Sequence, residues 1–545
     1  MQSFVLPWDL TFLYLSYPSP DSTTEKIVLL HHYLTKTADK LPDKEALICQ
    51  KKARLTYAQI ETYSNCLANA LKASGLNPLD RVAIYLENSV ESVISIFGIL
   101  KAGGIFSIIN PQTKVRRLKY ILNDCQVKIL VTQKSLLFNC LENLENLPNL
   151  NSLIFVEENQ DSLTHSLISH KKQLYFWELV KAFPNTHFES GCSSNDLCNI
   201  NYTSGSTGNP KGVMLTHQNM ISAAESIIEY LENTVDDVIV NVLPLSFDYG
   251  LYNVLMPIIF GGKVVLEKSF ISPHQLIGLV KKEQVNALPL VPTIVSLMLK
   301  LGNLKKYDLS QVKYITSTGQ ALPTQHLIQL QELFPQTKIY SMYGLTECKR
   351  VSYLPPDELL TKPNSVGKAM PNVEVYLVDE GGNKINQPGK IGELVIQGAN
   401  VMQGYWNLPQ ETAKVLRQNE QGEKVLYSGD FFKLDEDNYL YFVSRKDDMI
   451  KTSGERVSPK EIENVLYQLE GIYEVAVYGV DDEILGQAIK IVVALKEDSN
   501  LTEASIGEYC SQCLEKHMLP KYIEIQHTLP KSNNGKIDKK LLKAS

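Results

Sequence analysis

The strongest constraint on the fold is a regular alternation of helical periods with short β-branched runs between about Pro42 and Gly319. Helical periodicity covers residues 56–74 and 89–101, with the apolar run RVAIYL between them. Alternation of this kind produces parallel sheets covered by helices on both faces. We therefore predict an α/β fold whose large N-terminal part holds two helix-flanked sheets. The expected strands include residues 81–86, 128–132, 152–156 and 261–267.

The pattern changes after Pro371, where short strands alternate with Gly, Asn and Pro. The runs EVYLVD, GELVIQG and YLYFVS predict a small β-rich subdomain that ends near Ser444. The chain then returns to an α/β pattern, with helices expected at 459–469 and 502–517 and strands at 475–480 and 488–495. At 545 residues the chain is too long for one core. We expect a large N-terminal domain at 1–444 and a small C-terminal α+β domain at 445–545.

Composition excludes several function classes. The net charge is −7 and no block of Lys and Arg stands out, which argues against nucleic-acid binding. The apolar N-terminal stretch has no basic region, and the apolar run at 90–109 is interrupted by charges and a glycine pair, so we expect neither a signal peptide nor a membrane span. The close cysteine pairs 192/198 and 510/513 lack the partner pairs of a zinc site. We expect a cytoplasmic protein with reduced cysteines.

The strongest chemical signal is the run YTSGSTGNPKGVMLTH, which begins at Tyr202. Its glycines let backbone N–H groups reach an anion, and its hydroxyls and lysine add donors and a positive charge. A flexible linker would not continue through Pro-Lys-Gly into an apolar strand and helix. The run lacks the Walker A spacing, so we expect phosphate binding without the P-loop NTPase fold. The anion-binding candidates are Thr203, Ser204, Gly205, Ser206, Thr207, Gly208 and Lys211.

TSGSTGNPKG resembles the phosphate loop of the AMP-forming acyl- and amino-acid-adenylating superfamily, which includes acyl-CoA synthetases, peptide-synthetase adenylation domains and firefly luciferase. The resemblance continues in the family's order from about residue 40 to 541. It runs through LPLSFDYG, STGQALP, YGLTE, GELVIQGANVMQGYWN, YSGDF, RKDDMIKTSGERVSPKEIE and NGKIDKK. It implies an enzyme that uses ATP and Mg²⁺ to convert a carboxylic acid to its acyl-AMP and then transfers the acyl group to a thiol.

The resemblance also implies a nucleotide site built from several short motifs. Glu347 would bind Mg²⁺, because a hard cation that bridges phosphate oxygens favours a carboxylate ligand. Asp430 would accept hydrogen bonds from the ribose hydroxyls. Taken alone, either acid could be a surface carboxylate or a helix cap. The other implied contacts are Tyr343 stacked on adenine, Thr346 facing the phosphate, Gly319 and Gln320 in the adenine pocket, and Arg445 at the ribose.

Lys536 lies in a glycine-containing segment near the C-terminus, and the resemblance makes it the catalytic lysine of adenylation. It would bridge the substrate carboxylate and the α-phosphate, where negative charge accumulates. Without the resemblance, a solvated basic tail would explain this lysine better, because other lysines crowd the same segment. The family rotates its C-terminal domain between the two half-reactions, which places a hinge at Asp447. Ser444 is a departure, since many members have Gly before the Arg; it bears on the hinge rather than on the chemistry.

Asp248 bears on which acid is activated. It falls where amino-acid-adenylating members keep the aspartate that pairs with the substrate's α-ammonium, and a buried carboxylate without a cation would be costly. The alternative is that Asp248 caps the helix that follows. Two tyrosines and a methionine among the pocket positions imply a small or flat side-chain space. The pocket positions carried over are Phe247, Tyr249, Tyr252, Pro289, Thr316, Thr318, Met342, Arg350 and Val351.

The runs LPLSFDYGLY and YGLTECKRVSYLPP are similar to stand-alone ligases that activate L-proline for a separate acyl carrier protein, as in natural-product biosynthesis of the anatoxin type in cyanobacteria. No carrier-protein serine motif follows Lys536 and no condensation-type HHxxxDG occurs, so we expect an external thiol, from CoA or a carrier protein's phosphopantetheine. Two alternatives stay open. One is an acyl-CoA synthetase for a short or cyclic acid, and the other is a non-catalytic relative that binds nucleotide or a partner.

Overall fold

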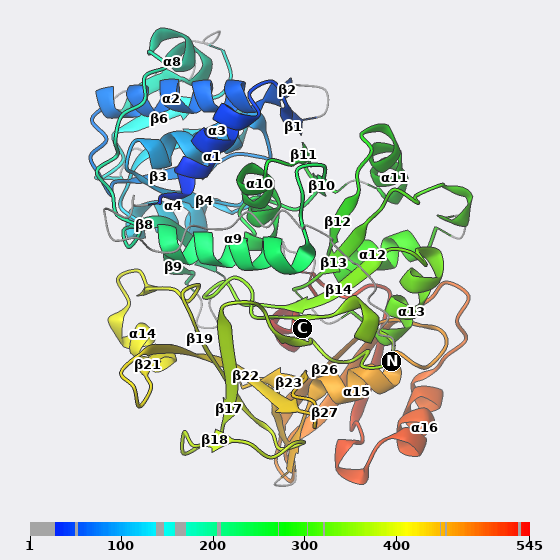
Figure 1. Ribbon diagram of the computed structural model, residues 1–545. Coiled ribbons are helices and arrows are strands. Elements are labelled where there is room, and N and C mark those ends of the chain that lie inside the picture. Colours follow the sequence, from blue (N-terminus) through cyan, green and yellow to red (C-terminus); the bar gives the residue numbers. More distant parts are fainter. Residues whose placement is uncertain are drawn as a thin grey trace, which may run out of the picture.

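The computed structural model describes residues 28–49, 53–137, 147–158, 171–203, 209–270, 272–301, 304–319, 322–446, 448–452, 455–531 and 536–544. Within these residues the strands group into four sheets. Figure 1 shows the two large sheets with their helices in the upper part of the view, the β-rich subdomain in yellow-green below them, and the C-terminal part in orange and red beside it. The sequence-based prediction of two helix-flanked sheets, a β-rich subdomain and a small C-terminal unit is confirmed.

The first large sheet has the order β20-β9-β8-β4-β3-β5-β6-β7 and is parallel from β8 to β7. Alternate residues of β3 face opposite sides: Val82 packs into the main core, whereas Ala83 packs beneath α4. Both faces are therefore covered, as expected for a parallel sheet. The strands are β3 (Arg81–Tyr85), β4 (Ile105–Ile108), β5 (Val127–Thr132), β6 (Ser152–Phe155), β7 (Lys172–Tyr175), β8 (Leu197–Thr203), β9 (Lys211–Thr216) and β20 (Gly404–Tyr405).

The second large sheet has the order β16-β15-β14-β13-β12-β10-β11-β1-β2, with parallel pairing from β14 to β1. It shares the main hydrophobic core with helices of the first sheet. Its strands are β1 (Glu45–Cys49), β2 (Ala53–Thr56), β10 (Val238–Asn241), β11 (Lys263–Leu266), β12 (Ala287–Leu290), β13 (Tyr314–Ser317), β14 (Lys338–Tyr343), β15 (Ser352–Leu354) and β16 (Lys368–Ala369).

The two helices predicted in this body, at 56–74 and 89–101, begin and end within one residue of those bounds. The apolar stretch at 90–109 is a buried helix followed by a buried strand, as expected. Among the described residues, no helix combines the length and apolarity needed to cross a membrane. The helices are α1 (Leu30–Lys40), α2 (Tyr57–Ala73), α3 (Val90–Lys101), α4 (Val115–Asp124), α5 (Lys134–Leu137), α8 (Phe176–Ala182), α9 (His217–Leu231), α10 (Asp248–Phe260), α11 (Pro273–Lys282), α12 (Pro292–Leu299) and α13 (Thr324–Leu333).

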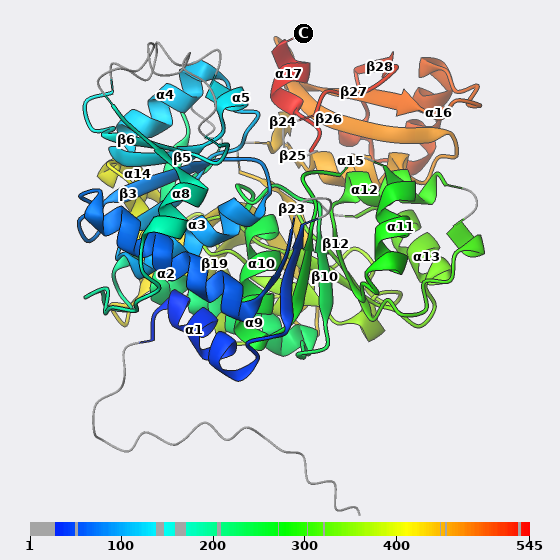
Figure 2. The ribbon, with the colours of Figure 1, turned by 90° about the horizontal axis from the view of Figure 1, so that it is seen from above.

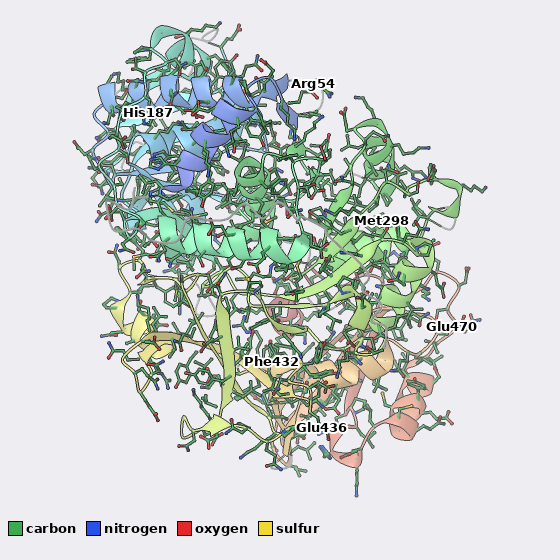
Figure 3. All side chains as sticks on the ribbon, in the orientation of Figure 1. Arg54, His187, Met298, Phe432, Glu436 and Glu470 are labelled. Atoms are coloured by element: carbon green, nitrogen blue, oxygen red, sulfur yellow. The ribbon has the colours of Figure 1, made fainter. Side chains whose placement is uncertain are left out.

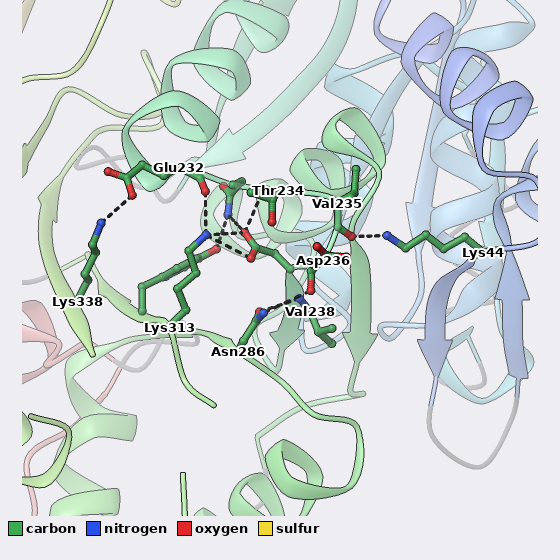
Figure 4. A network of polar contacts seen from close by, with 12 residues as sticks. Lys44, Glu232, Thr234, Val235, Asp236, Val238, Asn286, Lys313 and Lys338 are labelled. Atoms are coloured by element: carbon green, nitrogen blue, oxygen red, sulfur yellow. Dashed lines mark hydrogen bonds and ion pairs between the residues drawn. The ribbon is translucent and has the colours of Figure 1, made fainter. Parts of the chain in front are cut away.

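Polar side chains tie together the amino ends of the parallel strands in the second sheet (Figure 4). Lys313, just before β13, forms an ion pair with Asp237 at 3.4 Å and donates to the Glu232 carbonyl at 2.8 Å. Asn286, before β12, accepts a hydrogen bond from the Val238 backbone at 2.8 Å. These contacts satisfy groups at one edge of the sheet. The opposite edge, where the strands end, is left for ligands.

The β-rich subdomain is an antiparallel sheet of order β18-β17-β19-β22-β21, with β23 paired to β22. Phe432, labelled in Figure 3, lies on β22 and packs edge-to-face against both Tyr343 and Phe442, which joins this sheet to the body. The elements are β17 (Val373–Val378), β18 (Lys384–Ile385), β19 (Gly392–Gly398), α14 (Pro409–Val415), β21 (Leu416–Gln418), β22 (Lys424–Leu434) and β23 (Leu440–Arg445).

The C-terminal part has its own sheet, β25-β24-β27-β26 with β28 beside β27, and hydrophobic clusters of its own. It lies alongside α12 and β23 (Figure 2), and Lys300 of the body rests over the Tyr473 ring at 3.5 Å. The domain boundary at 444/445 stays a prediction. The elements are β24 (Ile450–Thr452), β25 (Glu455–Val457), α15 (Pro459–Leu466), β26 (Ile472–Asp482), β27 (Gly486–Leu495), α16 (Glu503–Cys513), β28 (Tyr522–Gln526) and α17 (Lys539–Ala544).

Two predicted boundaries in this part differ from the structure. The helix expected at 502–517 ends at Cys513, because Leu514 adopts an extended backbone, and a separate 3₁₀ turn follows at Lys516–Met518. The strand expected at 475–480 runs over Ile472–Asp482, because main-chain pairing with β27 continues to the hairpin turn. Side-chain periodicity carries little information about where such pairing stops.

Candidate active site

The predicted site residues come from both large sheets, the β-rich subdomain and the C-terminal part. Thr316 and Thr318 lie at the end of β13, Tyr343 ends β14, and Asp248 begins α10 after β10. Because carboxyl ends of neighbouring parallel strands meet at one edge, these residues converge there. Gln320, Asp447 and the loop 204–208 lie outside the described residues.

Asp430 and Arg445 pair directly across the β22–β23 hairpin. The Arg445 Nε lies 3.0 Å from Asp430 Oδ1, and the Tyr343 hydroxyl donates to Asp430 Oδ2 at 2.6 Å. Asp430 is only 3% exposed. Burial raises the pKa of this carboxyl, while Arg445 and the Tyr343 hydrogen bond lower it. Apart from the ionic contact, Oδ1 has no hydrogen-bond partner among the described residues. A buried carboxylate oxygen with acceptor capacity left, beside an aromatic ring, fits a nucleoside whose hydroxyls donate to it.

Lys536 reaches from the C-terminal part into the body. A Cβ built on Gly319 would lie 3.4 Å from Lys536 Cε and 3.7 Å from the Phe247 ring, so the lysine passes over the glycine with little space to spare. Burial lowers the pKa of Lys536, which Asp248 and Asp430 partly offset. The solvated-tail alternative therefore does not hold for Lys536, although its catalytic role stays a prediction.

Neighbouring lysines of the tail have different partners. Lys531 pairs with Glu474 at 2.6 Å, and Lys539 pairs with Glu463 at 2.7 Å, both within the C-terminal part. These ion pairs join the tail to strand β26 and helix α15 of the C-terminal part and do not enter the body. Lys536 is thus distinguished from these lysines by position, which sequence composition alone could not do.

Glu347 lies four residues after the end of β14 and is held by two contacts. The Tyr405 hydroxyl donates to its Oε1 at 2.8 Å, and the Met402 backbone N–H donates to its carbonyl at 2.8 Å. No described residue binds the second carboxylate oxygen. Mg²⁺ is usually held by one or two carboxylates together with substrate phosphates and water. An oriented carboxylate with one free oxygen fits that role, and Thr346 precedes it, half-buried.

The phosphate-loop strands form a hairpin, in which Thr203 of β8 is in register with Lys211 of β9. The Lys211 ammonium pairs with Glu411 at 2.6 Å and lies 5.1 Å from the centre of the Tyr405 ring. Lys211 is therefore fixed by a carboxylate at the loop's base. Glu411 was not predicted; its only sequence signal was its place in GYWNLPQET, just after a matched motif.

Asp248 is not the helix cap that sequence allowed as an alternative. Phe247 occupies the N-cap position of α10 and Asp248 is the first helical residue. The Asp248 Oδ2 accepts a hydrogen bond at 3.2 Å from the Nζ of Lys349, a residue that sequence reasoning missed. Lys349 is 3% exposed and lies 4.1 Å from the centre of the Tyr252 ring. Burial lowers the pKa of Lys349 to about 7, against the raising effect of Asp248.

Five of the predicted pocket positions line a small cavity next to the start of α10. The Tyr249 hydroxyl bonds to Thr316 Oγ1 at 2.6 Å, and the Arg350 guanidinium lies 5.2 Å from the centre of the Tyr249 ring. Tyr249, Pro289, Thr316, Met342 and Arg350 line one cavity, in which the centre of a water molecule can occupy about 10 Å³. That is room for about one water. Two other predicted pocket residues, Thr318 and Val351, are also buried and lie close in sequence to Thr316 and Arg350.

Comparison with known proteins agrees with this arrangement. The family model for AMP-binding enzymes matches residues 34–406, and the model for the AMP-binding enzyme C-terminal domain matches residues 461–536. A long-chain-fatty-acid–CoA ligase of Bacillus subtilis (strain 168) is 31% identical over 543 residues, covering 95% of this chain and 94% of the relative. Zwittermicin A synthase ZmaJ of Bacillus cereus is 29% identical over 513 residues, covering 92% of each.

Solved structures show the same fold. ATP-bound MatB from Rhodopseudomonas palustris superposes with a TM-score of 0.83 at 26% identity, covering 95% of this chain and 99% of that chain. The matched models, the full-length relatives and the convergence of Asp430, Arg445, Tyr343 and Lys536 on one strand edge lead to one conclusion. The chain belongs to the AMP-binding enzyme family and is an ATP-dependent, AMP-forming acid–thiol ligase.

Proposed function

We propose that this enzyme adenylates an α-amino acid, L-proline, and transfers the prolyl group to the phosphopantetheine thiol of a separate acyl carrier protein. The observation that carries the proposal is Asp248, a carboxylate with a side chain 16% exposed, which directly precedes Tyr249, a residue that lines a small cavity. The Lys536 ammonium is close enough for Asp248 to raise its pKa. An amino acid needs both signs of charge at such short range: a cation for its carboxylate and an anion for its ammonium.

The site residues divide the first half-reaction among themselves. An oxygen of the substrate carboxylate attacks the α-phosphorus of ATP, and the bond to the pyrophosphate oxygen breaks. Lys536 offsets the negative charge that gathers between carboxylate and phosphate. Asp430, Arg445 and Tyr343 hold the nucleoside in place. Glu347 would hold Mg²⁺, which neutralises phosphate charge when bound.

The size of the pocket supports a small acid. The cavity that Tyr249 lines is bounded by the bonded pair of Tyr249 and Thr316 and by Arg350. A long acyl chain would have to displace a buried guanidinium and break a buried hydrogen bond, both of which are costly. A compact ring such as that of proline needs less displacement of these groups than a long chain does.

In the second half-reaction a different face of the C-terminal part must line the site. The thiol sulfur attacks the acyl carbon, and AMP leaves with its phosphate oxygen. With Lys536 in the body, the C-terminal part has the orientation suited to adenylation. We propose that residues 445–545 rotate about Asp447 to replace Lys536 with a thiol-binding face.

One observation favours a second candidate function, an acyl-CoA synthetase for a short or cyclic acid. Lys349 already pairs with Asp248, so an acid without an amine would not leave the carboxylate unpaired. The desolvation argument for an amino acid is therefore weaker than sequence alone implied. The two candidates differ in the substrate's amine and in the thiol acceptor.

The test is substrate-dependent ATP–pyrophosphate exchange with Mg²⁺, over the twenty amino acids and a set of short, cyclic and aryl acids. Exchange with L-proline and not with acids that lack an amine supports the proposal. Thioester formation on a purified carrier protein, and not on CoA, completes it. Exchange only with acids that lack an amine would overturn it in favour of the second candidate.

A further inference from the structure

Lys349 lies in a tightly built turn. Its φ is +67°, a left-handed conformation that a non-glycine residue adopts only when its surroundings impose it. Gly344 makes the turn possible, because a Cβ there would lie 2.3 Å from the Lys349 carbonyl oxygen. The side-chain amide of Asn400 donates to the carbonyls on either side, Cys348 at 2.7 Å and Arg350 at 3.0 Å. The direction of the Lys349 side chain is thus fixed by its backbone.

In this direction the Lys349 side chain reaches one carboxylate oxygen of Asp248. The Lys349 Nζ donates to Asp248 Oδ2 at 3.2 Å, and the Tyr252 ring supports the lysine from the other side. With its side chain 3% exposed, Lys349 cannot rotate into water without opening the turn. Asp248 is more open, and no described residue donates to its Oδ1. The contact therefore holds one carboxylate oxygen and leaves the other without a donor among the described residues.

We propose that Lys349 is a positioning residue, which holds Asp248 by one oxygen so that the other receives the substrate's α-ammonium. This inference rests on the proposed amino-acid function. The lysine acts through a hydrogen bond, and its N–H groups can donate in either charge state. It fixes the orientation of Asp248 before the substrate arrives, so less conformational freedom is lost on binding.

A displaceable lysine is the competing interpretation, in which the substrate ammonium would replace Lys349 on the same oxygen. The structure favours positioning because the turn has a strained φ, two side-chain hydrogen bonds from Asn400 and a glycine contact, all of which hold the lysine in place. A group that had to leave its position for every turnover would not need such restraint.

The test compares L-proline with cyclopentanecarboxylic acid, which has the same ring without the amine, in ATP–pyrophosphate exchange. Lys349→Met keeps the side-chain length and removes the donor. We expect the ratio of kcat/KM for proline to that for the analogue to fall about 10- to 100-fold, the range for a lost hydrogen bond to a charged group. The change should appear in the KM of proline, with kcat and the analogue's kinetics close to wild type.

Lys101→Met is the matched control. Lys101 is also 3% exposed and pairs with a carboxylate, Glu61, at 2.7 Å, but it lies outside the site. It should leave the substrate ratio unchanged. An equal loss for both substrates in Lys349→Met would make Lys349 merely structural, and a lower proline KM would make it a competitor; either result overturns the inference. If the wild-type enzyme activates no amino acid, the proposed function fails first, and the inference with it.

Discussion

Replacing Lys536 with Ala should separate the two half-reactions. In the structure this lysine extends from the C-terminal part across Gly319 to the neighbourhood of Asp248 and Asp430. Its ammonium is the group from the C-terminal part that these contacts bring to the adenylation site. The substitution should therefore damage acyl-AMP formation and leave the later transfer to the thiol almost intact.

The size of the effect follows from what the ammonium does. It offsets charge that forms between two oxyanions in a site shielded from water, where removal of one such donor costs about 2.7–4 kcal/mol, or about 10²- to 10³-fold in rate. We expect ATP–pyrophosphate exchange with L-proline to fall by that factor. Thioester formation from synthetic prolyl-AMP should change by less than about threefold, since the family uses a different face of the domain for that step.

Lys531→Ala provides the matched control, because Lys531 lies in the same tail but pairs with Glu474 inside the C-terminal part. It should leave both half-reactions near wild type. Equal losses in both half-reactions for Lys536→Ala would point to a folding defect. Unchanged exchange in that variant would refute the catalytic assignment of the lysine.

Three further predictions concern the same site. Because burial lowers the pKa of Lys536, the lysine should lose its proton at a pH lower than 10.5, the usual lysine pKa. Exchange should therefore stay constant while the lysine is charged and fall as the pH rises through its pKa, and Lys536→Arg should move this fall to higher pH. Asp430→Asn removes the charged acceptor beside Arg445 and should raise the KM for ATP about tenfold, with little effect on the KM for the acid. Gly319 has φ +93° and faces Lys536, so Gly319→Ala should lower stability by about 1–3 kcal/mol in thermal unfolding and slow exchange, whereas Gly278→Ala, with open space around it, should do neither.

Sequence was sufficient for the architecture because periodicity reports directly on burial. Strand β3 alternates between two cores, and the helices at 57–73 and 90–101 match their predicted ranges closely. The fifteen-residue separation of Asp430 and Arg445 became a contact because a hairpin closes it. Motif order indicated which residues would meet at the strand edge.

Sequence was not sufficient for contacts that depend on a single backbone torsion or a distant partner. Nothing in the run TECKR marks Lys349 as buried, because lysine is normally exposed and its inward direction depends on a left-handed φ. Glu411 and Lys211 are 200 residues apart and meet only because β20 pairs with β9. The helix-cap alternative for Asp248 failed by one residue, because sequence patterns locate a helix start only to within a few residues.

The most direct test of the central claim compares wild type and Asp248→Asn in exchange with L-proline and with cyclopentanecarboxylic acid. Asparagine keeps an acceptor for Lys349 and removes only the charge that would bind an ammonium. We predict that wild type strongly prefers proline and that Asp248→Asn loses most of this preference through a higher proline KM. Proline turnover that is unchanged by Asp248→Asn, or a wild-type enzyme that prefers the acid without the amine, would contradict the account.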